Sequence, residues 1–374
     1  MQFVDLGRQF EQIEQDVRRN IDAVLSSQHY IMGAQVAQLE EKLAAFSGAP
    51  YALGCSNGTD ALVLLLMALG VGPGDAVFVP TFTFFSTAEC VSTVGATPVF
   101  VDVDADTFNI DVVSLKAAIA ATLAQGALRP RGIIPVDLFG LPADYDAIRV
   151  VADEQGLFVL EDAAQGLGGE YHGKRAGSLG DVAATSFFPA KPLGCYGDGG
   201  AVFVKDAKMA ELCKSIRIHG QGTDRYDNVR LGMNGRLDTL QAAVLLAKLK
   251  VFEGEIAARN RIAALYTQAL EAFIKVPRVP EGYRSVWAQY TLTAKDEGQR
   301  DTIVAQLKEK GIPVMIYYPT PLHRATAYAS LGYAPGSLLV SERLAKTVFS
   351  IPMHPYLRTD EIEMITAAVK EAIR

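Results

Sequence analysis

The sequence predicts an α/β protein with a mainly parallel sheet that helices cover on both faces, followed by a smaller domain. From residue 51 onward, seven short apolar runs alternate with helical stretches, which is the pattern of a parallel sheet buried on both faces. The chain has 374 residues, and its pattern changes after about residue 250. Because this length exceeds one ordinary domain, we expect a large domain over residues 1–250 and a small α+β domain over residues 251–374.

Two amphipathic helices are expected before the sheet. Ile13, Val17, Ile21 and Val24 recur at helical spacing, as do Val36, Leu39, Leu43 and Phe46, so each set forms one apolar helix face. After the sheet we expect a long helix that ends near Tyr266, a strand within 287–292 and a helix over 299–310. The seven expected strands are 51–54, 76–80, 97–101, 132–136, 157–160, 183–187 and 201–204.

Composition excludes several classes of protein. The net charge of −7 and the lack of a Lys/Arg cluster give no electrostatic footprint for nucleic acid. The amino terminus is polar rather than signal-like, and the most apolar run, 61–69, is too short to span a bilayer. We therefore expect a cytoplasmic protein. The cysteines lack metal-ligand spacing, so we expect no metal and free thiols at Cys55, Cys90, Cys195 and Cys213.

Lys191 is the candidate nucleophile. It lies between the apolar run 183–187 and a glycine-rich turn that leads into the run 201–204. Burial and nearby cations lower the pKa of a lysine, and the neutral amine can then form a Schiff base with an aldehyde. The alternative is a solvated surface lysine, which is the usual place for this residue type, but the bulky flanking residues argue against it.

Asp162 is the candidate acidic partner of Lys191. It follows the apolar run 157–160, and the carboxyl ends of buried parallel strands are where open α/β sheets bind ligands. An acidic helix cap is an equally ordinary explanation of such a residue. Together, however, Asp162 and Lys191 match the needs of pyridoxal phosphate: a lysine for its aldehyde and an acid that keeps its pyridine nitrogen protonated.

Gly58 and Thr59 are candidate phosphate ligands. They follow the first expected strand and precede the apolar helical stretch 61–69. Free backbone N–H groups at such a helix start attract anions. An ordinary helix cap by Asn57 or Thr59 is the alternative.

Three motifs resemble those of the DegT/DnrJ/EryC1/StrS sugar aminotransferase family. They are SNGTDAL at 56–62, EDAAQ at 161–165 and TSFFPAKPLGCYGDGGA at 185–201, and the likeness runs in order from about Gln28 to Leu357. The resemblance implies the fold of fold type I aminotransferases that depend on pyridoxal 5'-phosphate. It is greatest to the branch that aminates C3 of UDP-2-acetamido-2-deoxy-3-oxo-glucuronate.

The resemblance also implies further cofactor ligands. Ser186 would add its hydroxyl to the phosphate site, Phe84 would stack on the pyridine ring, and Gln165 would hydrogen-bond the ring hydroxyl. From periodicity alone, Phe82, Phe84 and Phe85 cannot be told apart, and any of them could be core. Asn234 would contact the cofactor phosphate of a neighbouring subunit, which implies a homodimer with shared active sites.

On the substrate side the resemblance implies Arg236, Tyr317 and Tyr318. Arg236 would lie near the anionic substrate, although Asn234 and Arg236 could also be simple polar groups at a helix entry. The family commonly has histidine where this chain has Tyr317, so the hydrogen-bonding character of that contact differs. His219 is expected to be a structural or substrate-contact histidine rather than a general base, since the freed lysine can move the proton, and His354 is expected to be structural.

The function predicted is transamination of a keto nucleotide sugar, with glutamate as amino donor, for surface polysaccharide synthesis such as that of lipopolysaccharide O-antigen. One alternative is amination at C4 of a 4-keto-6-deoxy nucleotide sugar, which the cofactor motifs do not exclude. Another is a non-catalytic regulatory or binding protein on the same scaffold, against which Lys191 and Asp162 count. A nicotinamide-dependent dehydrogenase is disfavoured because no GxGxxG follows an early strand.

Overall fold

A seven-stranded sheet forms the centre of the computed structural model, which describes residues 1–224 and 226–373. The strand order is β1-β9-β8-β5-β4-β2-β3. All neighbouring strands run parallel except that β9 is antiparallel to both β1 and β8, so the expected mainly parallel sheet is confirmed. The strands are β1 (Tyr51–Cys55), β2 (Asp75–Pro80), β3 (Thr97–Val101), β4 (Arg129–Ile133), β5 (Phe158–Asp162), β8 (Val182–Ser186) and β9 (Gly200–Val204).

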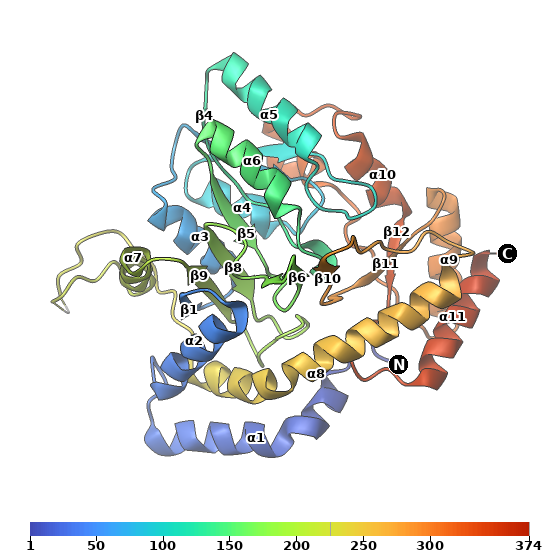
Figure 1. The fold of residues 1–374 in the computed structure, drawn as a ribbon, viewed down its shortest axis with the longest axis horizontal. Coiled ribbons are helices and arrows are strands. Elements are labelled where there is room, and N and C mark those ends of the chain that lie inside the picture. The colour runs from blue at the N-terminus through green and yellow to red at the C-terminus, as the bar shows by residue number, and fades with distance from the viewer. Residues whose placement is uncertain (225, 374) are drawn as a thin grey trace.

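Helices cover both faces of this sheet (Figure 1). Successive strand side chains point to opposite faces, so Val77 and Val79 of β2 join one hydrophobic cluster while Phe78 joins another. The first cluster includes α3 (Gly58–Ala68), α4 (Ser86–Thr93) and α7 (Ala207–Arg217). The second includes α5 (Val112–Gln125) and α6 (Tyr145–Gln155). Burial on both faces explains why the strands read as continuous apolar runs.

The amino-terminal helices and the long helix pack together below the sheet in Figure 1. The expected helices are α1 (Leu6–Ser27) and α2 (Ala34–Ser47), which bury Val17 and Leu39 among other residues. Both contact α8 (Thr239–Leu270). From beneath the sheet, α8 runs to the carboxyl-terminal elements and so connects the two parts of the molecule.

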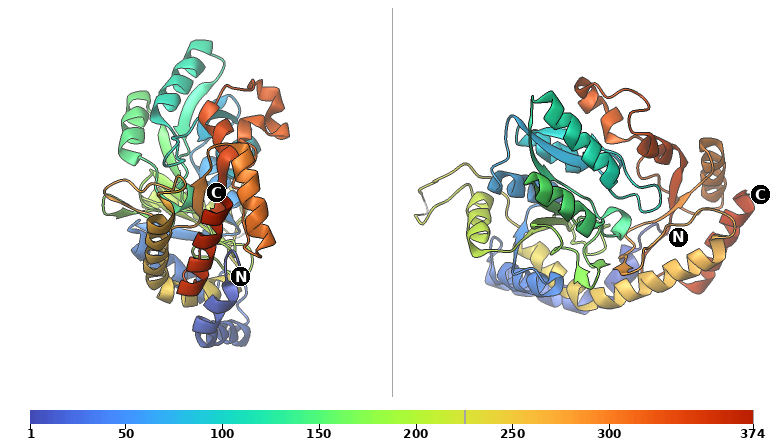
Figure 2. Two further views of the ribbon diagram at one scale, coloured as in Figure 1. Left: turned by 90° about the vertical axis from the view of Figure 1, so that its right-hand side faces the viewer. Right: turned by 45° about the horizontal axis from the view of Figure 1, so that its top comes forward.

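The carboxyl-terminal part has its own hydrophobic core, made by side chains from residues 262–372. In it β11 (Tyr290–Thr293) pairs antiparallel with β12 (Val348–Ile351), beside α9 (Glu297–Glu309), α10 (Leu339–Thr347) and α11 (Thr359–Ile373). Figure 2 shows these elements on the side of the molecule away from α7. The division expected near residue 251 falls inside the continuous helix α8 and stays a prediction.

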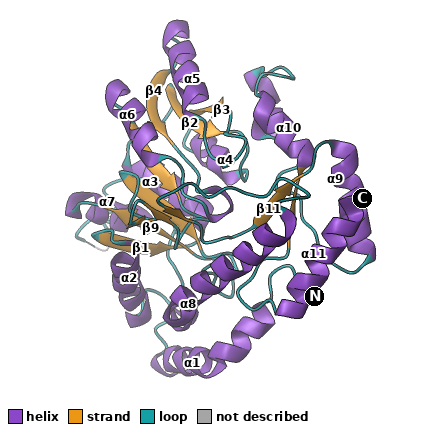
Figure 3. Ribbon diagram, turned by 45° about the vertical axis from the view of Figure 1, so that its right-hand side comes forward, coloured by secondary structure: helices purple, strands orange, loops and turns teal. Residues whose placement is uncertain are grey.

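A small three-stranded sheet connects the carboxyl-terminal part to the part that contains the main sheet, because β10 pairs with β6. It consists of β10 (Tyr283–Arg284), β6 (Glu170–Tyr171) and β7 (Lys174–Arg175). Figure 3 shows loops between the main sheet and β11, and Figure 1 places β6 and β10 in this region. In the part of the chain that the structure describes, no helix is both long and apolar enough to cross a membrane.

The fourth strand is the main correction to the expected elements. Expected at 132–136, it is Arg129–Ile133 instead. Its start is fixed by pairing with β2, where Arg129 lies opposite Asp75 and donates to that carboxylate over 2.7 Å. Ile134 and Val136 are buried beyond the end of the strand: the Ile134 N–H still donates to the Phe78 carbonyl at 2.9 Å, and Val136 forms one isolated bridge, to Asp162. An apolar run thus predicted burial correctly but not strand pairing.

Candidate active site

The candidate site lies at the carboxyl ends of β1, β2, β5 and β8. These strands point the same way, so the residues that follow them meet at one edge of the sheet. Asp162 ends β5 and Ser186 ends β8. Gly58 opens the helix after β1, and Phe84 lies in the segment after β2. The fold therefore gathers residues from four distant sequence segments.

Asp162 is a buried carboxyl group whose orientation is fixed by two donors. Its Oδ1 accepts a hydrogen bond from the Ala164 backbone N–H at 3.1 Å, and its Oδ2 accepts one from the Thr87 hydroxyl at 2.9 Å. Burial raises the pKa of Asp162, while these two hydrogen bonds and the charge of Lys191 act in the opposite direction. Thr87 was not identified from the sequence, because its partner is 75 residues away.

Lys191 is partly buried in the turn between β8 and β9. Three backbone hydrogen bonds shape this turn: Phe187 N–H to Gly199 O, Cys195 N–H to Phe187 O, and Lys191 N–H to Phe188 O. A Cβ at Gly194 would lie 2.5 Å from the Pro189 carbonyl oxygen, so the turn requires glycine there. Burial lowers the pKa of the Lys191 ammonium, and the charge of Asp162 partly offsets this effect. The neutral, nucleophilic amine is thereby favoured.

A cradle lies where the start of α3 meets the end of β8. Asn57 caps the helix through its Oδ1, which accepts the Asp60 N–H at 2.8 Å. The ordinary cap considered from the sequence is therefore present, yet it uses neither the Gly58 nor the Thr59 N–H. A Cβ at Gly58 would lie 2.6 Å from Ser186 Cβ, so glycine lets the helix start approach the serine hydroxyl closely.

The structure separates the three phenylalanines after β2. Phe82 is fully buried, with its ring 6.5 Å from that of Phe139. Phe85 packs on Tyr328 with ring centroids 5.5 Å apart. Phe84, in contrast, is 54% exposed. Of the three, Phe84 is therefore the ring with a face available to a ligand.

Gln165 connects the site to the substrate-side loop. Its Oε1 accepts a hydrogen bond from the Phe139 N–H at 2.8 Å, and its Nε2 donates one to the Tyr318 hydroxyl at 3.0 Å. The Tyr318 ring also lies 6.4 Å from the ring of Phe84. Tyr317 packs instead on Phe3 of the amino-terminal segment, with centroids 6.2 Å apart. Tyr318 thus joins the cluster around Asp162, through a contact that spans 153 residues.

Asn234 and Arg236 flank Gly235, whose N–H donates to the Arg217 carbonyl at 2.9 Å and whose carbonyl accepts the Ser56 N–H at 3.2 Å. Asn234 is exposed and forms an isolated bridge with Ile218. Arg236 lines an open hollow of about 630 Å³ together with His219 and Met32. Residues of the cluster around Asp162 and Lys191 do not line this hollow. The backbone of residues 234–236 therefore lies beside the end of β1, while the Arg236 side chain lines a hollow separate from the cluster around Asp162.

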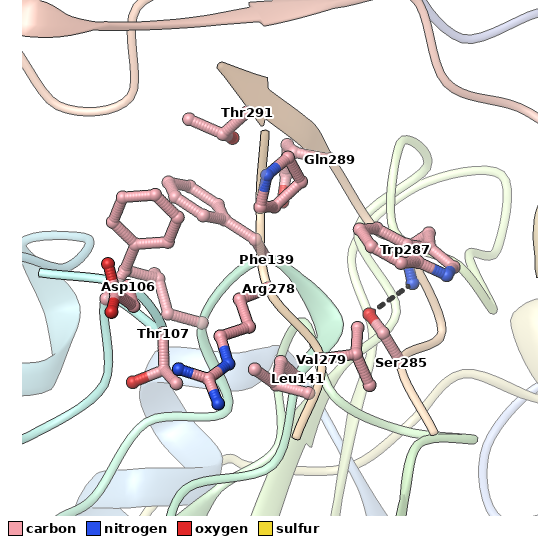
Figure 4. A pocket seen from close by; sticks show the side chains of 13 residues that line it. Asp106, Thr107, Phe139, Leu141, Arg278, Val279, Ser285, Trp287, Gln289 and Thr291 are labelled. Carbon is pink, nitrogen blue, oxygen red and sulfur yellow. Dashed lines mark hydrogen bonds between the residues drawn. The ribbon is translucent and has the colours of Figure 1, made fainter. Parts of the chain in front are cut away.

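Figure 4 shows a different, much smaller cavity, between the segment 106–108, the 3₁₀ turn Leu138–Gly140 and the carboxyl-terminal part. Its volume of about 20 Å³ holds at most one water molecule. It contains no site residue expected from the sequence, and no role is assigned to it. Nor does any group of His, Cys, Asp or Glu that could hold a metal occur among residues 1–224 and 226–373.

Comparison with known proteins adds to this geometry. Residues 11–370 match the family described as the DegT/DnrJ/EryC1/StrS aminotransferase family. The chain is 46% identical, over 99% of both chains, to the UDP-2-acetamido-2-deoxy-3-oxo-D-glucuronate aminotransferase of Pseudomonas aeruginosa.

Solved structures give the same result. A DegT DnrJ EryC1 StrS aminotransferase from Brucella abortus is 52% identical, with a TM-score of 0.96 over 99% of each chain. NtdA from Bacillus subtilis, solved with bound cofactor PMP, is 27% identical with a TM-score of 0.89, over 99% of this chain and 83% of that one.

Proposed function

The chain belongs to the DegT/DnrJ/EryC1/StrS aminotransferase family and is a pyridoxal phosphate-dependent aminotransferase of nucleotide sugars; on this premise, we propose that it aminates C3 of UDP-2-acetamido-2-deoxy-3-oxo-glucuronate with glutamate as donor. The 46% identity to an aminotransferase named for this sugar, over 99% of both chains, carries the proposal. The proposed setting is surface polysaccharide synthesis in the cytoplasm, as for lipopolysaccharide O-antigen.

The residues of the site fit pyridoxal phosphate. Gly58, Thr59 and Ser186 would hold the phosphate, since Gly58 leaves room beside the serine and first-turn N–H groups favour anions. Phe84 would stack on the ring, and Gln165 would donate to the ring hydroxyl. Asp162 would face the ring nitrogen. When bound, pyridoxal phosphate supplies an electron-withdrawing ring that stabilises a carbanion.

Two side chains carry the proposed chemistry. Lys191 Nζ would hold the cofactor and, when free, accept a proton from the α-carbon of glutamate and later return one toward the sugar. The lowered pKa of Lys191 supports this role, because only the neutral amine accepts a proton. Asp162, held by Thr87 and Ala164, would keep its carboxylate in one orientation beside the ring.

The substrate-side residues are proposed to be Arg236, Tyr317 and Tyr318. Arg236 would pair with an anionic group of the nucleotide sugar, which a guanidinium recognises well. Tyr318 would hold the orientation of Gln165 through their hydrogen bond. Tyr317 would meet the sugar with a hydroxyl, a group that can both donate and accept.

Asn234 and Arg236 would act in the site of a second subunit, so that a homodimer forms two shared sites. The exposure of the segment that carries them supports this arrangement: Leu231 is 89% exposed. We further propose that residues 251–374 form the small domain, which begins within α8 and supplies Tyr317 and Tyr318.

Product analysis tests the substrate. The purified enzyme is incubated with glutamate and either the 3-oxo-glucuronate or a 4-keto-6-deoxy nucleotide sugar, and the products are identified by mass spectrometry. We expect an amine only from the 3-oxo sugar. Amination of the 4-keto sugar alone would overturn the proposed substrate while leaving the family assignment intact.

Mixed dimers test the shared site. Co-expressed Lys191→Ala and Asn234→Ala chains each lack one half of a site, and a mixed dimer keeps one intact site. We expect each variant alone to be impaired and the mixture to recover about a quarter of the wild-type rate, as random pairing in a two-fold dimer requires. If mixing recovers nothing beyond the two separate rates, the sites are not shared.

A further inference from the structure

Two buried carboxyl groups beside Asp162 have no part in the proposed chemistry. Asp137 follows β4 and Glu161 precedes Asp162 on β5, and both are fully buried. Within the described ranges, the structure records no ion pair to either of them. Three neighbouring carboxyl groups therefore lie in the interior without a cation of their own, apart from Lys191 near Asp162. Ionising all three would be costly, since buried like charges repel strongly.

The hydrogen bonds distinguish Glu161 from Asp137. Glu161 accepts from three backbone N–H groups, those of Gly177, Leu179 and Gly180, which use both of its oxygens. Such a carboxyl group is arranged as an ionised acceptor. The segment 177–180 thus supplies donors in place of a cation.

Asp137 has the complementary pattern. Its Oδ1 accepts from the Ala143 N–H at 3.1 Å and from the Tyr145 hydroxyl at 2.8 Å. Its Oδ2 is buried, and no hydrogen-bond donor reaches it. One oxygen with two donors and one with none is the arrangement of a carboxylic acid whose second oxygen carries the proton.

We propose that Asp137 is a neutral carboxylic acid in the folded enzyme, that its Oδ2 hydroxyl donates to the Glu161 carboxylate, and that it is a positioning residue for Asp162 and Gln165. The proposal rests on the proposed role of Asp162 beside the cofactor ring. A neutral Asp137 spares Asp162 a second nearby negative charge, so that Asp162 can itself remain ionised.

The connection to the site runs through the backbone. The Asp137 N–H donates to the Asp162 carbonyl at 3.0 Å, and two residues later the Phe139 N–H donates to Gln165. A Cβ at Gly166 would lie 2.3 Å from Asp137 Cβ, so this glycine lets the loop beyond Asp162 pack directly on Asp137. Loss of the Asp137 side chain should therefore disturb Asp162 and Gln165 together.

The groups facing Asp137 agree with this assignment. They are Glu161 and Asp162 on β5 and Tyr145 at the start of α6. Burial and the Glu161 charge raise the pKa of Asp137 well above its ordinary range. Burial also raises the pKa of Glu161, to about 7, against the pull of its backbone donors.

Infrared spectroscopy of the apoprotein tests the proton directly. At pH 8 the wild type should show the carbonyl band of a protonated carboxyl group, and Asp137→Asn should lack it. Asp137→Asn should keep its melting temperature, because an amide accepts at one end and donates at the other, as the acid does. Glu161→Gln should melt lower, because its amide would direct N–H toward N–H donors. The assignment would be overturned if the wild type showed no protonated band. It would also be overturned if Glu161→Gln lost the band and kept its melting temperature while Asp137→Asn did not.

Cofactor titration tests the positioning role. Asp137→Leu keeps the branching at Cγ, in a larger side chain, but removes every side-chain hydrogen bond, and we expect its affinity for pyridoxal phosphate to fall about tenfold, by analogy with the loss of a supporting partner at metal sites. Asp137→Asn should restore both the affinity and the wild-type pH dependence of cofactor absorbance. Equal affinity in Asp137→Leu and the wild type would overturn the positioning role. If instead the wild type bound no cofactor, the proposed function would fail and the infrared result would be unaffected.

Discussion

Two glutamates of the same chain respond to their surroundings in opposite ways. Burial raises the pKa of Glu161 to about 7, although three backbone N–H groups donate to it. At the other end of the molecule, the hydrogen bonds from Arg8 lower the pKa of Glu361 to about 2. Arg8 binds both oxygens of Glu361, at 2.7 and 2.8 Å. The pKa of Glu161 is dominated by its burial, and no cation pairs with it among the described residues, whereas the pKa of Glu361 is dominated by its hydrogen bonds to Arg8.

This contrast separates structural acids from functional ones. The pair of Arg8 and Glu361 joins the start of α1 to the start of α11 and so fastens the two ends of the chain together. Among the described residues, Asp137, Glu161 and Asp162 form no comparable ion pair with an arginine. Carboxyl groups kept in the interior without cations are a cost to stability, and such costs concentrate at sites of chemistry. The following predictions test this distinction.

The largest effect is expected from Lys191, the candidate nucleophile, whose burial lowers the pKa of its amine. In Lys191→Ala the amine that would hold the cofactor and carry the proton is gone, and we expect turnover to fall by about 10⁴-fold or more, as for other covalent catalysts. Lys174→Ala, at an exposed lysine, is the control and should retain full activity. Borohydride reduction of the loaded wild type should tag the peptide that contains Lys191; an untagged peptide would contradict the prediction.

Asp162→Asn should have the next largest effect. The amide matches the shape of the acid but carries no charge to keep a ring nitrogen protonated, and we expect turnover to fall by about 10²- to 10³-fold. Single-turnover measurements with glutamate would locate the loss in the first half-reaction. Asp153→Asn, at an exposed acid on α6, should leave the rate unchanged. A rate close to the wild type in Asp162→Asn would show that the charge is not needed.

Thr87→Val should produce a smaller loss. It removes the donor to Asp162 Oδ2, which raises the pKa of Asp162 because the charged form loses a hydrogen bond. A hydrogen bond to a charged group contributes about 1.5 to 3 kcal/mol, so we expect turnover to fall about tenfold or somewhat more. The rate should also decline at higher pH than in the wild type as the medium is acidified. Thr87→Ser keeps a hydroxyl and should largely retain both properties.

Lys191 and Asp162 could be predicted from the sequence because their signals are local. Each follows a strand-like run, and the carboxyl end of a buried strand is a fixed place in this class of fold. Gly58 was found in the same way, as the first residue of a helix after a strand. The seven strands were recognised because burial on both faces leaves uninterrupted apolar runs.

The supporting contacts could not be predicted in this way. The hydrogen bond from Thr87 to Asp162 and that from Gln165 to Tyr318 cross 75 and 153 residues, and periodicity does not report which distant side chains meet. The register of β4 was missed for a related reason, since Ile134 and Val136 are buried beyond the end of the strand and keep only single contacts with neighbouring strands. Periodicity could not separate Phe84 from Phe82; the family resemblance selected Phe84, and in the structure the two differ in exposure.

The smallest effect is expected from the structural acid, Glu361→Gln. The folded-state pKa of Glu361 lies below its unfolded value of about 4.3, so its contribution is present above that pH and is lost as pH falls toward about 2. We expect a loss of about 1 kcal/mol of unfolding free energy at neutral pH, measured by urea titration, without a change in turnover per folded enzyme. Asp360→Asn, one residue earlier and exposed, should change neither quantity measurably. Because the difference between wild type and Glu361→Gln arises from the ionised pair, it must shrink as the pH is lowered from about 5; a difference that stays constant would mean that packing, not charge, stabilises this junction.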